Sequence, residues 1–286
     1  MMQNLYLIGE ATSYSLSPAM WNHAFKAAGL AEYWRYTGCP TRQAELPAAI
    51  TSLRRPGTAG ANITMPYKVA ALAVADGRNE DADRAGATNW LSRHGGSLYA
   101  ANTDVAAVRT LLAERGDDAR PPWRVVLLGA GGAGRAAVAG LNGFHVADLV
   151  ILDRCSTAAI GLADRARAWG LPGRVGDWPT LESVVREADL VINSAPFGMT
   201  DPSEPSPIPS SWFCGRPMLY DFVYTPVPTA LQRTATWAGV TVCDGLAHLE
   251  SQAVATLPLL DLPESFAPLL RAGLTAAAGR TPCRWS

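Results

Sequence analysis

Paired cysteines and clustered histidines are missing from the 286-residue sequence. The five cysteines are scattered and form no CxxC pair, which argues against a disulfide framework and a cysteine-based zinc site. The four histidines include no HxH or HExxH spacing, so we expect no metal site. We interpret the cysteines as free thiols in a reducing compartment. They are Cys39, Cys155, Cys214, Cys243 and Cys283.

An excess of charge of either sign is also absent, as is any long hydrophobic run. Lysine plus arginine number 24 and aspartate plus glutamate 25, giving a net charge of -1. This balance provides no basic field for a nucleic acid or an anionic membrane. No stretch approaches the roughly 18 apolar residues of a membrane span, and no basic region precedes Glu10. We therefore expect a cytoplasmic protein.

The sequence does contain an alternation of short apolar runs and alanine-rich stretches, which is typical of an α/β fold. Its length, with 48% hydrophobic and 17% charged residues, predicts a globular chain of two domains. The polar segment 115–124, with its Pro121–Pro122 pair, is a predicted break. We expect strands over 5–8, 60–63, 125–128, 149–152 and 190–192. Helices are expected over 18–28 (with Ser17 as N-cap), 104–115, 249–260 and 267–278.

A glycine-rich segment follows the apolar run 125–128 and precedes a predicted helix over 135–141. It matches GxGxxG and consists of Gly129, Ala130, Gly131, Gly132, Ala133 and Gly134. Glycines let a pyrophosphate approach the backbone, and a helix N-terminus offers unpaired N–H groups with a partial positive charge. Asp153 ends the next apolar run about 20 residues later, where a ribose-binding carboxylate belongs. The segment predicts a Rossmann-like dinucleotide-binding domain.

Asp153 and Arg154 together bear on which dinucleotide binds. A carboxylate accepts hydrogen bonds from the ribose hydroxyls and repels a 2′-phosphate, so Asp153 favours NAD. The Arg154 guanidinium beside it can pair with that phosphate, which leaves NADP open. A solvated turn after a strand is the alternative interpretation of both residues. We expect NAD as the cofactor.

Small polar groups gather in the first hundred residues. Ser15 and Ser17 lie two apart, so in an extended segment their hydroxyls point to one side and form a receptor for a carboxylate. The segment 62–68 contains Thr64 at a predicted helix start and Lys68 about one turn later. A lysine is usually a solvated charge, but one with an acidic partner can carry a proton. Asp104 is the candidate partner.

Eight short motifs occur in order along nearly the whole chain. They are Ser15-Leu16-Ser17-Pro18, Asn62–Lys68, Gly86-Ala87-Thr88-Asn89, Asn102-Thr103-Asp104, Gly129–Ala133, Asn193–Met199, Asp221–Tyr224 and Asp244-Gly245-Leu246. In these motifs the sequence resembles the shikimate/quinate dehydrogenase family. The resemblance implies a substrate domain over 1–104 and 247–286 and a dinucleotide domain over 105–246. It also implies reversible oxidation of a ring hydroxyl of shikimate or quinate by hydride transfer to a nicotinamide.

The resemblance further implies the roles of individual residues. Ser15 and Ser17 would hold the substrate carboxylate, assisted by Tyr224. Lys68 would be the acid/base group, with Asp104 beside it. The ring hydroxyls would be bound by Thr64, Lys68, Asn89, Asp104 and Gln252. The cofactor would contact Gly129, Ala130, Gly131, Gly132, Ala133, Asp153, Arg154, Asn193, Phe222 and Gly245.

Three residues depart from the family pattern. Trp21 replaces a usual histidine, Trp90 a small polar residue and His248 a methionine. Because the tryptophans flank substrate motifs, a dehydrogenase for a related hydroxy acid such as aminoshikimate is an alternative. A non-catalytic dinucleotide sensor is a second alternative. The expected partner is a small cyclic hydroxy acid, bound by a monomer or homodimer.

Overall fold

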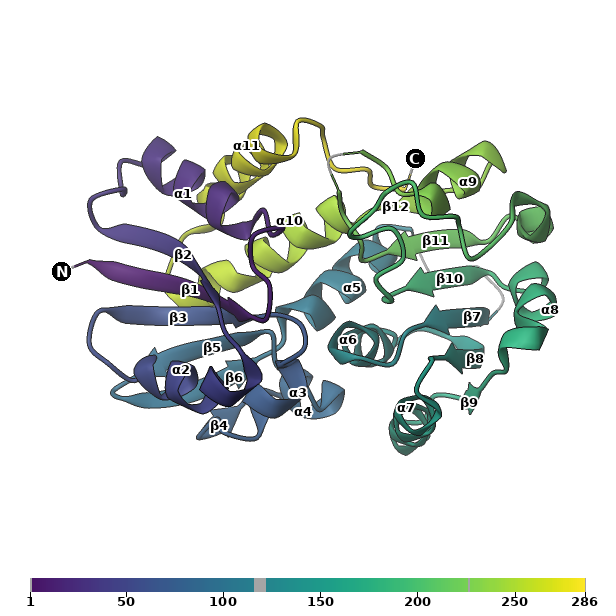
Figure 1. Cartoon of the computed structure of the whole chain (residues 1–286), viewed down its shortest axis with the longest axis horizontal. Helices are drawn as coiled ribbons and strands as arrows, with labels where there is room; N and C mark the ends of the chain where they lie inside the picture. Colours follow the sequence, from purple (N-terminus) through teal and green to yellow (C-terminus); the bar gives the residue numbers. More distant parts are fainter. Residues whose placement is uncertain (1, 116–121, 226, 286) are drawn as a thin grey trace. The chain divides into compact units, whose positions relative to one another are not determined.

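The computed structural model describes residues 2–115, 122–225 and 227–285, and its chain folds into two compact units (Figure 1). The first contains Met1–Ala106 and Leu249–Thr281, and the second contains Ala107–His248 and Pro282–Ser286. The chain passes from one unit to the other within helix α5 (Thr103–Ala113) and again within helix α10 (Gly245–Thr256). Of the predicted break at 115–124, residues 116–121 lie outside the described residues.

The first unit is built on a six-stranded sheet. Its strands are β1 (Gln3–Gly9), β2 (Trp34–Pro40), β3 (Thr58–Ile63), β4 (Gly77–Arg78), β5 (Trp90–His94) and β6 (Ser97–Ala101). Their order is β2-β1-β3-β5-β6-β4, and only β5 runs antiparallel to its neighbours. The carboxyl ends of β1, β3 and β6 therefore lie at one edge, together with the start of β5.

Helices cover both faces of this first sheet. One core cluster joins the sheet to α2 (Leu46–Ser52), α3 (Lys68–Leu72) and α4 (Glu80–Ala85). Helices α1 (Ser17–Ala27) and α11 (Ala267–Ala278) pack against each other. The 3₁₀ turns η1 (Gln43–Glu45), η4 (Leu257–Leu260) and η5 (Glu264–Phe266) complete the unit. Segments from both ends of the chain thus build one unit.

The second unit has a fully parallel sheet. Its strands are β7 (Trp123–Leu128), β8 (Val146–Leu152), β9 (Gly173–Val175), β10 (Leu190–Asn193), β11 (Met218–Asp221) and β12 (Val242–Cys243), in the order β12-β11-β10-β7-β8-β9. The covering helices are α6 (Gly132–Gly140), α7 (Ser156–Ala168), α8 (Leu181–Arg186) and α9 (Ala230–Trp237). The turns η2 (Trp178–Thr180) and η3 (Ser210–Gly215) also belong to this unit.

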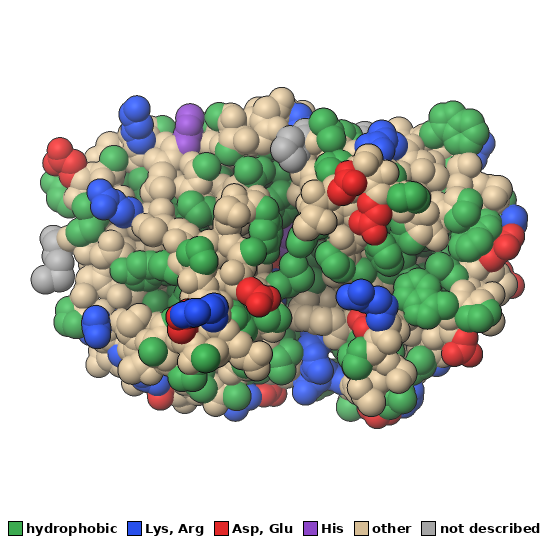
Figure 2. All heavy atoms as spheres, in the orientation of Figure 1, with side chains coloured by type: hydrophobic (Ala, Val, Ile, Leu, Met, Phe, Trp, Pro, Cys, Tyr) green, Lys and Arg blue, Asp and Glu red, His purple; other side chains and the backbone are tan. Residues whose placement is uncertain are grey.

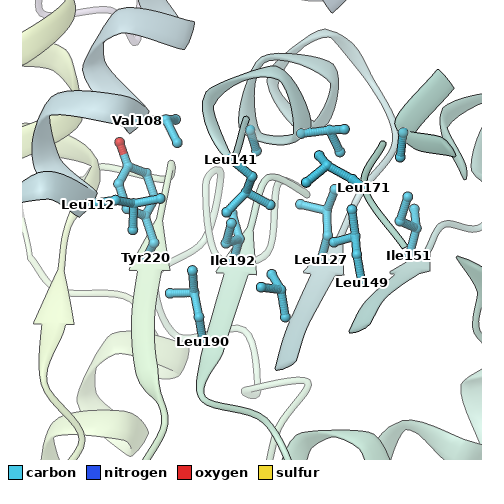
Figure 3. Packing of buried hydrophobic residues seen from close by; sticks show 14 of the residues in the cluster. Val108, Leu112, Leu127, Leu141, Leu149, Ile151, Leu171, Leu190, Ile192 and Tyr220 are labelled. Carbon is cyan, nitrogen blue, oxygen red and sulfur yellow. The ribbon is translucent and has the colours of Figure 1, made fainter. Parts of the chain in front are cut away.

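Strand β7 shows why the second sheet is covered on both faces. Its Leu127 packs with helices α5, α6 and α7, while its Leu128 packs with α8 and α9. Figure 3 shows the first of these layers, with Val108 and Leu112 of α5 near Tyr220 of β11. Since successive side chains alternate between faces, a strand buried on both sides has an uninterrupted apolar sequence. The predicted α/β fold of two domains is confirmed.

Two local expectations differ from the structure. Ser17 is the first residue of α1 and not its N-cap, which is Leu16. Helix α3 begins only at Lys68, since the backbone turns at Thr64–Tyr67 and the Met65–Pro66 peptide bond is cis. Lys68 is therefore at the start of its helix and not one turn inside it.

The end of the chain also differs from the expected division. Residues 282–285 belong with the second unit, whereas the predicted substrate domain extended to 286. Arg284 forms a β-bridge with Cys243 of β12, and the Trp285 indole N–H donates to the Leu111 carbonyl over 2.7 Å.

On the face that Figure 2 shows, acidic and basic side chains are interspersed. Within the described residues, no helix is long and apolar enough to cross a membrane.

Candidate active site

An ion pair lies at the carboxyl edge of the first sheet. The Lys68 Nζ atom donates to Asp104 Oδ2 over 2.6 Å, and the two side chains are only 15% and 6% exposed. Lys68 stands at the start of α3, and Asp104 lies in the first turn of α5. Burial protects such a pair from screening by solvent and fixes the amine in one place. The structure therefore brings Lys68 and Asp104 together, as the sequence predicts.

Amide and hydroxyl groups extend this pair into a network. The Asn89 amide donates to Asp104 Oδ1 over 2.8 Å and to Thr103 Oγ1 over 2.9 Å. The Asn89 side-chain oxygen Oδ1 accepts a hydrogen bond from the Thr103 backbone N–H over 2.7 Å. The Thr103 hydroxyl donates to Gln252 Oε1 over 3.1 Å, so Gln252 of α10 joins the same cluster. Sequence reasoning named Asn89 and Gln252 but missed Thr103, although it stands inside the Asn102-Thr103-Asp104 motif.

The two serines lie after β1, near the same edge. Ser15 Oγ accepts a hydrogen bond from the Ser17 N–H over 3.3 Å. Tyr14, directly before Ser15, forms a hydrogen bond of 3.3 Å between its hydroxyl and Thr64 Oγ1 of the segment 62–68. Ser15 is half-buried and Ser17 is buried at the helix start. Tyr224, the other predicted carboxylate ligand, belongs to the second unit, where it follows β11.

The two tryptophans that depart from the family pattern are core residues. Trp21 is 1% exposed, and its ring lies 5.6 Å from Phe25 and 6.2 Å from Phe266. Trp90 is fully buried and packs on Gly60, where a Cβ would come within 2.7 Å of its ring. Both rings fill the interior of the first unit, so neither provides a reason to expect an unusual acid.

The glycine loop after β7 has the shape that a phosphate-binding turn requires. Gly129 has a φ of +100°, which L side chains rarely adopt. A Cβ on Gly134 would lie 2.1 Å from the Gly129 carbonyl oxygen, so only glycine fits there. Gly131 is the N-cap of α6 without a side-chain cap, and a Cβ there would meet open space. The backbone at the start of α6 is therefore accessible to an anion.

Asp153 is bound to the glycine loop itself. Its Oδ2 accepts from the Ala130 N–H over 2.7 Å, and its Oδ1 accepts from the Cys155 N–H over 2.7 Å. Arg154 next to it is exposed. The carboxylate thus links the glycine loop after β7 to the turn after β8, and the Arg154 guanidinium is the charged group that the turn after β8 presents to solvent.

A second polar cluster lies at the carboxyl edge of the second sheet. The Asn193 amide donates to Asp221 Oδ1 over 2.8 Å, and the Phe222 N–H donates to the Asn193 carbonyl over 2.9 Å. A Cβ on Gly245 would lie 2.5 Å from the Phe222 carbonyl oxygen. The structure therefore brings together Asn193, Phe222 and Gly245, three predicted cofactor residues.

Asp221 at the centre of this cluster is fully buried. Burial raises its pKa to about 7, against hydrogen bonds from the Val223 N–H, Asn193 and Gln232 that favour the charged form, while the charge of Asp244 raises it further. Among the described residues, no group of three or more His, Cys, Asp or Glu side chains is arranged to hold a metal.

Comparisons with known proteins identify relatives of this chain. Residues 7–91 match the family profile described as the shikimate dehydrogenase substrate binding domain. The chain is 38% identical over 258 residues to a shikimate dehydrogenase (NADP(+)) of Salinibacter ruber, which covers 88% of this chain and 90% of that protein.

Two solved structures show the same fold over nearly the whole chain. Shikimate 5-dehydrogenase from Thermus thermophilus, in complex with NADP(H) and shikimate, has a TM-score of 0.80 at 31% identity and covers 97% of this chain and 100% of its own. Quinate dehydrogenase from Corynebacterium glutamicum, in complex with NAD, has a TM-score of 0.83 at 28% identity and covers 96% of this chain and 99% of its own.

The expected preference for NAD is wrong. Relatives that are 38%, 35% and 33% identical are NADP(+) enzymes, and each alignment covers at least 88% of this chain. The physical reason lies in the turn after β8. The Asp153 carboxylate that should have repelled a 2′-phosphate accepts hydrogen bonds from Ala130 and Cys155, and Arg154 is the exposed charge.

The family predicted from the eight motifs is confirmed. The profile match, the relatives above 30% identity and the shared fold all identify the same group of proteins. This chain belongs to the shikimate/quinate dehydrogenase family, and it is a dehydrogenase.

Proposed function

We propose that this chain catalyses reversible hydride transfer between NADP and a ring hydroxyl of shikimate, with quinate as a second substrate. The observation that carries the proposal is the buried Lys68–Asp104 pair, with Nζ and Oδ2 2.6 Å apart, inside a network of amide and hydroxyl groups. The names and bound ligands of this chain's relatives support shikimate as the substrate and NADP as the cofactor.

The Lys68 amine is the group that moves the proton. With NADP⁺ bound as the hydride acceptor for the carbinol C–H bond, the hydroxyl proton would pass to Lys68 Nζ when that group is the neutral amine. In the reverse direction the ammonium returns that proton to the oxygen of the ketone. Asp104 holds the amine beside the reacting oxygen, and Asn89 in turn holds Asp104. A positioned acid/base group of this kind contributes about 10²–10⁴-fold to a rate.

The neighbouring polar groups orient the ring. Thr64, Asn89 and Gln252 would bind its hydroxyls, because each presents a donor or acceptor at the edge where Lys68 lies. Ser15 and Ser17 would bind its carboxylate, and Tyr224 would assist. Several fixed contacts on one small ring align the reacting carbon, which lowers the entropic part of the barrier.

The glycine loop fits a dinucleotide. Gly131 leaves open space at the N-terminus of α6, where a pyrophosphate would accept backbone hydrogen bonds. The exposed Arg154 would pair with the 2′-phosphate of NADP. Asn193, Phe222 and Gly245 would line the end of the site that faces the nicotinamide. When bound, NADP supplies the hydride acceptor that no side chain provides.

The test is the absorbance of reduced nicotinamide, followed with purified protein, NADP⁺ and either shikimate or quinate. We expect turnover with shikimate. Lys68→Ala should lower kcat at least about 100-fold and change the KM for shikimate only a few-fold. Lys26→Ala is the matched control, because Lys26 is exposed on α1 and should leave the activity unchanged.

Other outcomes would overturn parts of the proposal. Full activity in Lys68→Ala would remove the lysine from the chemistry. Turnover of a related hydroxy acid but of neither shikimate nor quinate would replace the substrate. Tight NADPH binding without turnover of any ring acid would make the chain a dinucleotide sensor.

A further inference from the structure

A buried tyrosine–histidine pair lies within the second unit, beside the predicted cofactor residues. The Tyr220 hydroxyl and His248 Nδ1 are 2.7 Å apart. Tyr220 is fully buried on β11, and His248 is 6% exposed in the first turn of α10. The two rings meet edge to face, with centroids 5.9 Å apart. Neither residue has a role in the proton transfer or the phosphate binding described above.

The imidazole also packs against Phe222. The ring centroids of Phe222 and His248 are 4.3 Å apart, and those of Phe222 and Tyr220 are 5.3 Å apart. Phe222 itself is half-buried, so part of its ring remains accessible while the ring contacts two buried neighbours. Its backbone is held by the Asn193 carbonyl and by the close approach of Gly245. The orientation of the Phe222 ring therefore depends on the imidazole behind it.

The hydrogen bond between Tyr220 and His248 constrains this part of the core more than apolar packing alone would. A buried imidazole or phenol requires a hydrogen-bond partner to offset its desolvation, and here each ring satisfies one polar atom of the other. An apolar side chain such as the methionine typical of the family would fill the same volume without that requirement. The hydrogen bond fixes one ring orientation of His248, whereas a methionine keeps three rotatable bonds.

We propose that His248, locked by Tyr220, is a positioning residue that holds the Phe222 ring in the orientation required to contact the nicotinamide. This inference rests on the proposed function, because it assumes that the second unit binds NADP through Phe222. If it holds, loosening the imidazole weakens the binding of the cofactor and leaves the substrate contacts of the first unit unchanged.

The experiment compares Tyr220→Phe, His248→Met and the double variant. Tyr220→Phe deletes only the hydroxyl, and we expect the NADPH dissociation constant, measured by fluorescence titration, to rise roughly three- to tenfold, the range of one hydrogen bond. The KM for NADP⁺ should rise by the same factor, while the KM for shikimate stays within about twofold. Adding His248→Met to Tyr220→Phe should weaken the binding little further, because both substitutions break the same hydrogen bond.

Tyr99→Phe is the matched control. Tyr99 also meets a histidine edge to face, since its ring lies 5.5 Å from His94, but it is 48% exposed on β6 of the first unit. NADPH binding unchanged in Tyr220→Phe, with only the melting temperature lowered, would overturn the inference and leave a packing role. If Tyr220→Phe fails to fold, His248→Met alone decides, because it breaks the same bond.

Measurements on the wild-type protein distinguish a failure of the proposed function from a failure of the role inferred for His248. If it neither binds NADPH nor oxidises shikimate or quinate, the proposed function fails and this inference fails with it. If the wild type binds and turns over but the variants match it, only the inference fails.

Discussion

Lys68 is one of only two lysines among the 24 basic residues of the chain, the other being Lys26. Arginine supplies every other positive side chain, including those in the surface ion pairs with Asp76 and Asp148. An arginine remains protonated in proteins, whereas an amine can release and recover a proton. At the one position where the proposed chemistry needs a proton carrier, the chain has a lysine.

Lys68→Arg tests this distinction. The variant keeps a positive charge beside Asp104 but cannot accept the hydroxyl proton, so we expect kcat to fall at least about 100-fold, as in Lys68→Ala. The measurement is the initial rate with shikimate and NADP⁺, with NADPH binding as the control for folding. A variant that kept more than about a tenth of kcat would show that charge alone is sufficient.

The position of a single residue in the site could be predicted from the sequence when few chemical roles suit its side chain. A lysine and an aspartate in two motifs of one family indicate a pair, and the structure brings them within 2.6 Å. Thr103 was not predictable, because a threonine at a helix start usually serves as a cap, and only its contacts with Asn89 and Gln252 place it in the network. Trp21 was misleading for a related reason. It stands close to a motif expected to bind the substrate, yet its ring faces the interior.

At the scale of an element, the glycine loop packs closely against the start of α6. Gly134→Ala introduces a Cβ that would lie 2.1 Å from the Gly129 carbonyl oxygen, so the loop must move. We expect the NADPH dissociation constant to rise about tenfold or more, equivalent to about 1.4 kcal/mol, as measured by fluorescence titration.

Gly161→Ala in α7 is the control for that prediction. A Cβ at Gly161 meets no atom within 4 Å, and the residue is inside a helix of 13 residues. The substitution should stabilise the protein by roughly 0.5–1 kcal/mol and leave NADPH binding unchanged. Equal binding by Gly134→Ala and the wild type would contradict the assignment of the loop.

Elements were predictable where one local pattern decides them. The apolar runs of the second unit became parallel strands because both faces of that sheet are covered. The start of α3 was misplaced, since Pro66 is equally compatible with a first helical turn and with the turn that the structure contains. Ser17 was misplaced as an N-cap because Leu16 already has helical backbone angles.

At the scale of the whole molecule, Asp221 couples stability to pH. Burial raises its pKa to about 7, while an unfolded aspartate titrates near 3.9. Its contribution to stability is therefore complete below about pH 4 and is lost as the pH rises through about 7. Between pH 5 and 8 we expect the free energy of unfolding of the wild type to fall relative to that of Asp221→Asn. Urea unfolding at each pH measures both.

The difference between the two proteins is the informative quantity, because all other titrating groups are shared. It should change by no more than about 1.4 kcal/mol per pH unit, the limit for a single proton. Parallel pH profiles would mean that the hydrogen bonds from Asn193 and Gln232 keep Asp221 charged throughout.

The order of segments along the chain has a consequence for synthesis on the ribosome. The first unit uses residues 249–281, and the second uses residues 282–285, so both are completed by the final part of the chain described here. While residues 107–248 are being made, the first sheet still lacks α11, which packs against α1. A nascent chain therefore exposes the part of the α1 surface that α11 covers until α11 has been made. Chaperones that bind exposed hydrophobic segments would meet this chain early and release it late.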